Sequence, residues 1–363
     1  MKRLPLWTLI TLLLAMLALV ACRPTTPPTA APTATPTPSG PRELVVMTHD
    51  SFEVSEEVMR QFEEANHAKV TVLKSGDTGS ALNKAILSKD APLADVFYGV
   101  DNTFLSRALD AGIFEPYASP MLDHIPAKFK MDPQNRALPV DYGDVCLNYD
   151  KAYFQEHHLA VPQSLEDLTK PEYKGLLVVE NPATSSPGLA FMLATVGHFG
   201  PNQFLDYWKA LKANDVLVVD DWNTAYFTHF SGSAGKGAYP LVVSYGTSPA
   251  AEVYFASTPM EEPPTGAITA ADTCFRQIEF VGILKGTKNR DLAEKFVDFM
   301  LDLTFQQDIP LQMWMFPVRP DAELPEVFVK FAQTAEQPAY VSPEDINAHR
   351  EEWIKAWSEV MLR

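Results

Sequence analysis

The chain has 363 residues, of which 46% are apolar, and it carries a formal net charge of −17. This length and apolar fraction are enough for a sizeable hydrophobic core, with room for more than one. The acidic balance argues against nucleic acid as a partner, because phosphate binding depends on lysine and arginine, and it favours solubility and cationic solutes.

The first 22 residues have the pattern of an export signal. Two basic residues precede an apolar run at 6–20, which is too short for a comfortable membrane span. The sequence LVAC at 19–22 then has the form of a bacterial lipobox, in which the cysteine becomes the lipid-bearing first residue of the mature protein. We therefore expect 1–22 to be a lipoprotein signal peptide with lipidation at Cys22. The alternative is an ordinary cleaved signal in which this cysteine is a coincidence.

Residues 23–42 follow as a segment composed mainly of Pro, Thr and Ala. This composition cannot build a core and predicts an extended, disordered tether. The tether would hold a folded domain away from the membrane that carries the lipid.

Two further cysteines, Cys146 and Cys274, occur in the rest of the chain. An exported protein meets an oxidising compartment, so a disulfide between them is chemically permitted. The sequence alone does not show that they meet, and pairing is only the simplest of the alternatives.

Strand-like and helix-like segments alternate from residue 43 onward. Short apolar runs predict buried strands, and apolar stripes at helical spacing predict helices. Ser55 is a suitable cap for the first helix and Gly112 a suitable stop for the third. The predicted strands are 44–47, 69–73, 94–98, 176–180, 216–219, 241–245 and 278–284. The predicted helices begin after Ser55 and continue with 80–87, 102–112, 188–198, 202–212, 291–301 and a last one from 343. This alternation predicts an α/β fold with parallel, doubly wound sheets in two lobes and a cleft between them.

Polar and aromatic residues directly follow several of the predicted strands. Because ligands of open α/β sheets bind at the carboxyl ends of strands, these loops are the candidate binding segments. Small and hydroxyl residues before a helix suit an anion or a hydroxyl group, and aromatic residues beside carboxylates suit a flat cation. Helix capping and ordinary core packing explain the same residues at least as well. The loops are 48–52, 75–80, 181–188, 220–223, 244–249 and 313–317.

Catalytic chemistry has little support in the sequence. The motifs G-x-S-x-G and H-E-x-x-H and the phosphate-binding P-loop do not occur. His157 and His158 lack partner ligands at metal spacing, so we expect them at the surface. Three carboxylates, Asp132, Asp141 and Asp144, have no identified acid–base partner. We expect neither an enzyme nor a bound metal or cofactor.

An ordered set of short motifs runs through the whole of 43–363. They are DSF at 50–52, the Asp77 loop with 80–83, ADV at 94–96 with VDN at 100–102, PVDYG at 139–143, NYDK at 148–151, TSSPGL at 184–189, Trp222 with AY at 225–226, SY at 244–245 with TSP at 247–249, and WMFPV at 314–318. In this order the set resembles the thiamine-binding periplasmic proteins, the solute-binding components of ABC importers for thiamine.

The resemblance implies a two-lobed class II periplasmic-binding-protein fold that closes about a hinge. It implies one lobe made of 43–145 and 275–363 and a second made of 146–274. The implied ligand is thiamine, thiamine monophosphate or thiamine diphosphate, and the implied partners are the permease and ATPase of the importer, with no nucleic acid. We expect an exported, lipid-anchored monomer. The residues expected to bind the ligand are His49, Asp77, Thr78, Ser185, Trp222, Tyr245 and Trp314.

The chain departs from the family at the pyrimidine side of the expected site. The resemblance implies two stacking tyrosines there, whereas this chain has His49 and Ala251. Histidine can still stack but alanine cannot, and Tyr254 or Phe255 could take over from nearby. Two alternatives therefore stay open. One is the same fold with another cargo, such as ferric iron, a polyamine or a small anion, and the other is an exported enzyme acting on thiamine-like compounds.

Overall fold

A computed structural model describes residues 40–232 and 237–363. The expected signal peptide, Cys22 and most of the expected tether lie outside the described residues. Pro41–Arg363 form one compact unit. None of the helices in the described ranges is long and apolar enough to cross a membrane.

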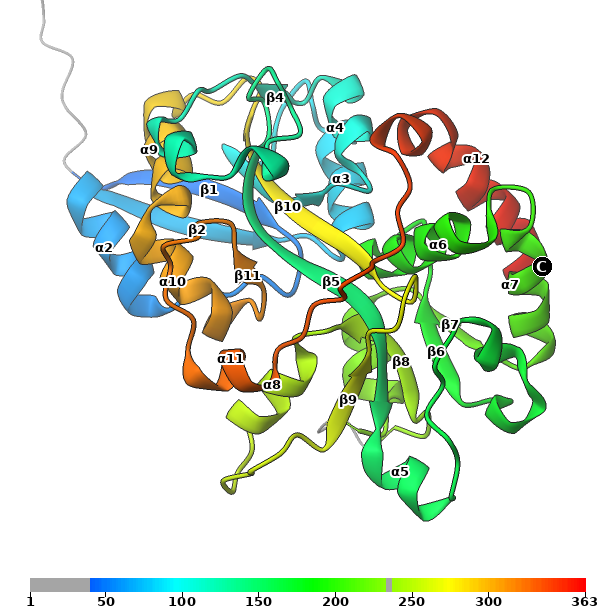
Figure 1. Ribbon diagram of the computed structural model, residues 1–363. Helices are drawn as coiled ribbons and strands as arrows, with labels where there is room; N and C mark the ends of the chain where they lie inside the picture. The colour runs from blue at the N-terminus through cyan, green and yellow to red at the C-terminus, as the bar shows by residue number, and fades with distance from the viewer. Residues whose placement is uncertain (1–39, 233–236) are drawn as a thin grey trace, which may run out of the picture. The chain divides into compact units, whose positions relative to one another are not determined.

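Eleven strands of the described chain form one mixed sheet (Figure 1). The strands are β1 Arg42–Thr48, β2 Ala68–Lys74, β3 Val96–Asp101, β4 Phe114–Glu115, β5 Leu138–Asp150, β6 Leu177–Glu180, β7 Leu217–Val219, β8 Leu241–Tyr245, β9 Thr265–Ile268, β10 Phe275–Leu284 and β11 Phe316–Pro317. Their order is β2-β1-β3-β10-β5-β8-β6-β7, with β4 beside β10, and with β9 and β11 beside β5.

The direction of the strands corrects the expectation of a parallel sheet. β2, β1 and β3 are parallel to one another, and so are β7, β6 and β8. Between these two groups, β10 runs antiparallel to both β3 and β5, and β5 runs antiparallel to β8. The two long strands therefore connect two parallel α/β groups, which are the two lobes of the fold (Figure 1).

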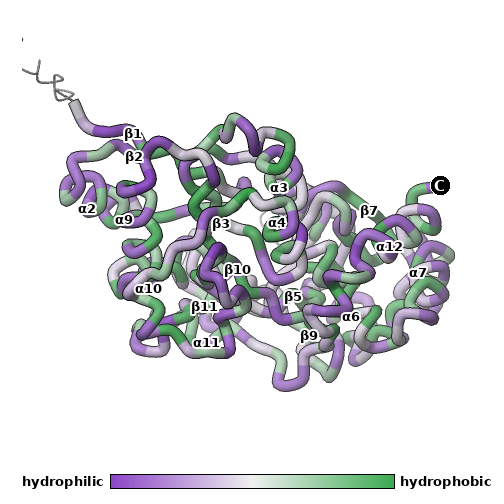
Figure 2. Tube along the Cα trace, turned by 90° about the horizontal axis from the view of Figure 1, so that it is seen from above, coloured by the Kyte–Doolittle hydropathy of each residue, from purple (hydrophilic) through white to green (hydrophobic). Residues whose placement is uncertain are grey.

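Helices pack on both strand groups. The α-helices are α2 Glu56–Asn66, α3 Thr78–Leu87, α4 Leu105–Ala111, α5 Lys151–Glu156, α6 Ser186–Phe199, α7 Phe204–Ala213, α8 Ser248–Tyr254, α9 Arg290–Leu301, α10 Leu303–Gln312, α11 Glu326–Phe331 and α12 Pro343–Met361. Short 3₁₀ turns span Pro120–His124, Ala127–Phe129, Glu166–Thr169 and Pro171–Tyr173, and a π-helical turn, η5, spans Thr224–His229. The last helix, α12, lies beside α7 in both views (Figures 1 and 2), where Trp357 meets Trp208 edge to face at 5.3 Å.

Local sequence signals explain where several of these helices begin and end. Ser55 caps α2 by accepting a hydrogen bond from the backbone N–H of Val58, and acidic residues fill the first turn. Gly112 ends α4 with a φ of 66°, a left-handed conformation that glycine adopts without steric cost. Ser342 caps α12 in the same way as Ser55 caps α2. These capping signals are local, which is why they can be read from the sequence.

The connection between the lobes is covalently and electrostatically reinforced. Cys146 on β5 and Cys274, directly before β10, form a disulfide between Cα atoms 4.3 Å apart. Next to it the buried Asp144 accepts two hydrogen bonds from Arg276, each 2.8 Å long. The expected lobe boundaries, 145/146 and 274/275, lie next to the two cysteines of this disulfide, and the boundaries stay a prediction.

Candidate functional site

A cavity of about 470 Å³ lies between the two strand groups. The loops that follow β1, β2, β7 and β8 reach it, together with the segment that follows α10. Among the described residues that line it, none is a lysine or an arginine, whereas six are carboxylates. These are Asp50, Glu53, Asp77, Asp221, Glu252 and Glu279. A concave surface with charges of one sign focuses a negative potential, which favours a positively charged solute.

The structure brings most of the expected site residues together at this cavity. The six that line it are His49, Asp77, Thr78, Trp222, Tyr245 and Trp314. Ser185 is the exception, because it is fully buried as the cap of α6 and accepts a hydrogen bond from the backbone N–H of Gly188. Its neighbours Ser186 and Pro187 line the cavity in its place. The TSSPGL motif contains both residues, since Ser185 caps α6 and the adjacent Ser186 lines the cavity.

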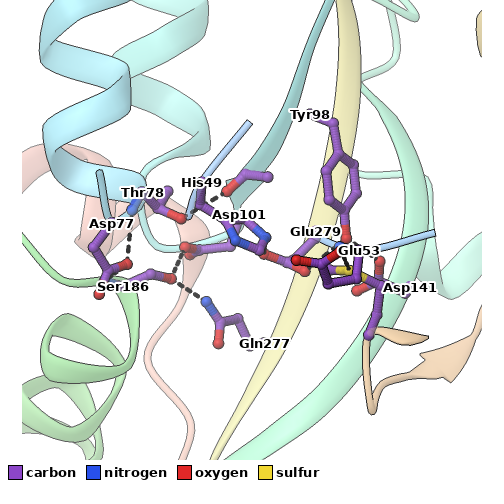
Figure 3. A network of polar contacts seen from close by, with 12 residues as sticks. His49, Glu53, Asp77, Thr78, Tyr98, Asp101, Asp141, Ser186, Gln277 and Glu279 are labelled. Carbon is purple, nitrogen blue, oxygen red and sulfur yellow. Dashed lines mark hydrogen bonds and ion pairs between the residues drawn. The ribbon is translucent and has the colours of Figure 1, made fainter. Parts of the chain in front are cut away.

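Asp77 connects the two lobes at the cavity wall (Figure 3). It caps α3, and its Oδ1 accepts a 2.7 Å hydrogen bond from the backbone N–H of Thr78. The same carboxylate accepts backbone hydrogen bonds from Ser186 at 3.4 Å and from Trp222 at 3.2 Å, both in the other lobe. Burial raises the pKa of Asp77, and these hydrogen bonds oppose that rise. The carboxylate therefore already occupies the anion position at the N-termini of both α3 and α6.

Aromatic rings form the other wall. The Trp222 indole stacks on Tyr226 with ring centroids 5.0 Å apart, meets Tyr245 edge to face at 6.3 Å, and donates to Ser244 Oγ at 3.0 Å. Trp222 lies two residues before the π-helical turn η5, an element that often occurs at functional sites. Flat faces held in this way suit a planar cation.

Trp314 extends the aromatic wall from the opposite lobe. Its backbone has a φ of 57°, which is rare and costly for a bulky residue and recurs where ligands are clamped. Its ring lies 5.4 Å from the rings of both Tyr254 and Phe255. Phe255 lines the cavity beside Ala251, whereas Tyr254 does not line it. Of the two aromatic substitutes proposed for the alanine, Phe255 is thus the one at the cavity.

A buried carboxyl pair at the cavity was not recognised from the sequence. Glu279 lines the cavity and lies opposite Asp141 in the register of β10 and β5. The Tyr98 hydroxyl contacts both carboxyl groups, and His49 Nε2 lies 3.3 Å from Glu279 Oε1 (Figure 3). Burial raises the pKa of Glu279 to about 7, and it lowers the pKa of His49. The only available signal was the unpartnered Asp141, because cross-strand register is not visible in one sequence.

A second buried polar cluster lies beside Asp77. The Ser186 hydroxyl, in the second lobe, hydrogen-bonds to Asp101 and is contacted by the Gln277 amide (Figure 3). All three residues are buried, and burial raises the pKa of Asp101. The cluster ties β3 and β10 to the start of α6.

The other candidates from the sequence lie in structural roles. Asp132 pairs with Arg136 and Asp144 with Arg276. His157 stacks on Tyr153 at 4.0 Å and is exposed, as is His158. Within 40–232 and 237–363, no group of three or more His, Cys, Asp or Glu side chains is arranged to hold a metal ion.

Comparison with known proteins identifies the family to which this architecture belongs. The family described as bacterial extracellular solute-binding protein matches residues 91–340. The thiamine-binding periplasmic protein of Salmonella typhimurium is 30% identical over 327 residues, which cover 88% of this chain and 94% of that protein. The solved structure of a periplasmic thiamin binding protein superposes with a TM-score of 0.78 at 28% identity, covering 89% of this chain and 99% of the other.

More distant structures share the fold alone. A ferric binding protein from Campylobacter jejuni has a TM-score of 0.70 at 21% identity, covering 87% of this chain and 99% of that chain. With two α/β lobes, a hinge of two crossing strands and a cleft between them, this chain has the class II binding-protein fold. It belongs to the bacterial extracellular solute-binding proteins and, within them, to the family of the thiamine-binding periplasmic proteins.

Proposed function

We propose that this protein captures thiamine, or a thiamine phosphate, outside the cytoplasm and delivers it to the permease of an ABC importer. The observation that carries the proposal is the cavity with six carboxylates, several aromatic faces and, among its described lining residues, no basic side chain except His49. Thiamine combines a cationic thiazolium with a flat aminopyrimidine, and aromatic faces beside carboxylates recognise such a group. The names of the relatives point to the same ligand.

In this proposal the two lobes share the ligand. Trp222 and Tyr245 from one lobe and Trp314 from the other would enclose the thiazolium, because all three line the cavity. His49 would face the aminopyrimidine, with Phe255 supplying the ring that Ala251 lacks. A ligand that contacts both lobes stabilises the closed form by its higher affinity for that form.

The tail of the ligand would lie near Asp77, Thr78 and Ser186. Helix N-termini attract phosphate, but here the Asp77 carboxylate already accepts from the first N–H groups of α3 and α6. A phosphate at this place would also meet a like charge. We therefore propose that the hydroxyl tail of thiamine is preferred to the charged tail of thiamine diphosphate.

The proposed delivery requires export and anchoring. Residues 1–22 would direct export, Cys22 would carry the lipid, and 23–42 would tether a monomeric binding domain that meets the permease and ATPase. Replacing Cys22 by alanine should move the protein from the membrane fraction to the soluble fraction. An unchanged membrane fraction would contradict the anchor without touching the ligand assignment.

A titration of the purified protein with thiamine, followed by tryptophan fluorescence and calorimetry, tests the ligand. We expect saturable quenching, because two tryptophans line the cavity, and weaker binding of thiamine diphosphate. Ferric citrate and spermidine serve as comparison ligands for the alternative cargoes. Binding of either one in place of thiamine would overturn the thiamine assignment and keep the solute-binding role.

A further inference from the structure

Two acidic side chains meet at the cavity without a basic partner. Asp141 and Glu279 are cross-strand neighbours and are 0% and 5% exposed. The Tyr98 hydroxyl oxygen lies 2.5 Å from Asp141 Oδ2 and 2.9 Å from Glu279 Oε2. Among the described residues no lysine or arginine pairs with either carboxyl group, and Glu279 has only His49 within ion-pair distance.

Hydrogen-bond counting shows that this arrangement holds a proton. A phenol hydroxyl donates one hydrogen, so it cannot donate to both carboxyl groups at once. The second contact is satisfied only when a carboxyl group carries a proton and donates it. Both contacts are satisfied when the Tyr98 hydroxyl donates to the fully buried Asp141 and a protonated Glu279, which faces the cavity, donates to the Tyr98 oxygen. In this arrangement the carboxyl proton lies on Glu279, which is also the member of the pair that a ligand can reach.

The surroundings of Glu279 oppose its ionisation in the empty cavity. Burial is the main cause that raises the pKa of Glu279 to about 7, and nearby carboxylates add to it. His49 does not compensate fully, since burial lowers its own pKa and so disfavours the charged imidazolium. The titratable groups that face Glu279 are His49 after β1, Asp77 before α3, Tyr98 and Asp101 on β3, Asp141 on β5 and Tyr245 on β8.

We propose that Glu279 exchanges its proton for the positive charge of the ligand, so that capture of a cation releases a proton to solvent. In the balanced step, the Glu279 carboxylic acid and the free cation give a carboxylate–cation contact and one solvated proton. Glu279 is then a specificity-determining residue, because a neutral ligand of the same shape has no charge to take the place of the proton. This inference rests on the proposed function, because it takes from it that the ligand is a cation.

Calorimetry on the wild-type protein provides the first test. With a pKa of about 7 in the free protein, thiamine affinity should fall about tenfold between pH 8 and pH 6. Titrations at pH 7 in two buffers of different ionisation enthalpy should show release of about half a proton per thiamine bound. A neutral analogue, in which the thiazolium is replaced by an uncharged thiazole, should bind with equal affinity at both pH values. Equal thiamine affinity at pH 6 and pH 8, with no buffer dependence, would overturn the proposal.

Two variants separate Glu279 from the other carboxylates. Glu279→Gln keeps the shape and should abolish both the pH dependence and the proton release. Glu53→Gln removes another lining carboxylate, which is exposed and outside the pair, and should retain the tenfold ratio between the two pH values. If both variants retain that ratio, the proton comes from another group and the assignment to Glu279 is wrong.

A measurement without ligand distinguishes failure of this inference from failure of the proposed function. A carboxyl group whose pKa is raised in the folded state favours the fold when protonated, so its contribution is lost as pH rises from about 4.5 to about 7. The melting temperature of wild type relative to Glu279→Gln should therefore be higher at pH 5 than at pH 8. If thiamine does not bind at any pH but this difference in melting temperature is present, the inference that Glu279 carries a proton stands and the ligand assignment fails. If thiamine binds but the difference is absent, the proton inference fails.

Discussion

Removing the disulfide between Cys146 and Cys274 should destabilise the folded state strongly. The two cysteines are 128 residues apart in sequence. The entropy of closing a loop of that length in the unfolded chain corresponds to about 5 kcal/mol at 25 °C, and measured values typically fall nearer 2–4 kcal/mol. We therefore expect a loss of about 3–5 kcal/mol in the free energy of unfolding. The cross-link acts mainly on the unfolded chain, so thiamine affinity at temperatures well below melting should change little.

Urea denaturation of oxidised and reduced wild-type protein measures this loss with identical side chains in both samples. The double variant Cys146→Ala/Cys274→Ala should behave like the reduced protein, within about 1 kcal/mol for the small change in packing. Blocking the thiols after unfolding and counting them by mass spectrometry shows that reduction is complete. A loss below about 1 kcal/mol in fully reduced protein would refute the reasoning, because the cross-link would then not restrict the unfolded chain.

Three other substitutions test particular contacts. Trp222→Ala should weaken thiamine binding about 30-fold, which corresponds to about 2 kcal/mol for the loss of a desolvated aromatic face, while Trp222→Phe should keep most of the affinity in the same titration. Equal thiamine affinity of the wild type and both variants would show that Trp222 does not contact the ligand. Gly99→Ala should lower the stability by about 2 kcal/mol or more in a denaturation curve, since φ is 104° and a Cβ would lie 2.4 Å from His49 Cδ2. Asp144→Ala should lower stability by about 2–3 kcal/mol in the same assay, because Arg276 and a buried backbone N–H lose their acceptor; a change under 0.5 kcal/mol would show that solvent replaces it.

Much of the α/β pattern could be predicted because its signals are local. Apolar runs mark β1, β3 and β8, and caps or stop residues mark α2 and α4. β5 was missed because Pro139, Gly143 and two aspartates interrupt its apolar run. Those aspartates accept hydrogen bonds from Tyr98, Arg276 and the backbone of Ala335, which are distant in sequence. The antiparallel centre of the sheet depends on these non-local pairings, so the expectation of a parallel sheet failed there.

For the candidate site, too, local sequence signals were predictive and contacts between distant residues were not. Loops after parallel strands converge on one sheet edge, which is why most of the expected residues line one cavity. Ser185 and Ser186 are adjacent hydroxyl residues, and backbone geometry decides that the first caps α6 and the second lines the cavity. The role of Glu279 depends on its register against Asp141, and neither residue carries a motif that signals it.

The order in which the central strands are synthesised has a consequence for folding. β10 begins at Phe275, yet it supplies the missing neighbour of both β3 and β5. Until β10 has been synthesised, β3 and β5 each lack a neighbouring strand on one side, and the first three-quarters of the chain cannot complete its core. Such distant pairing slows folding, and we expect the growing chain to stay unfolded until its last quarter is made. In the proposed export, such a delay would keep the polypeptide unfolded and therefore competent for translocation.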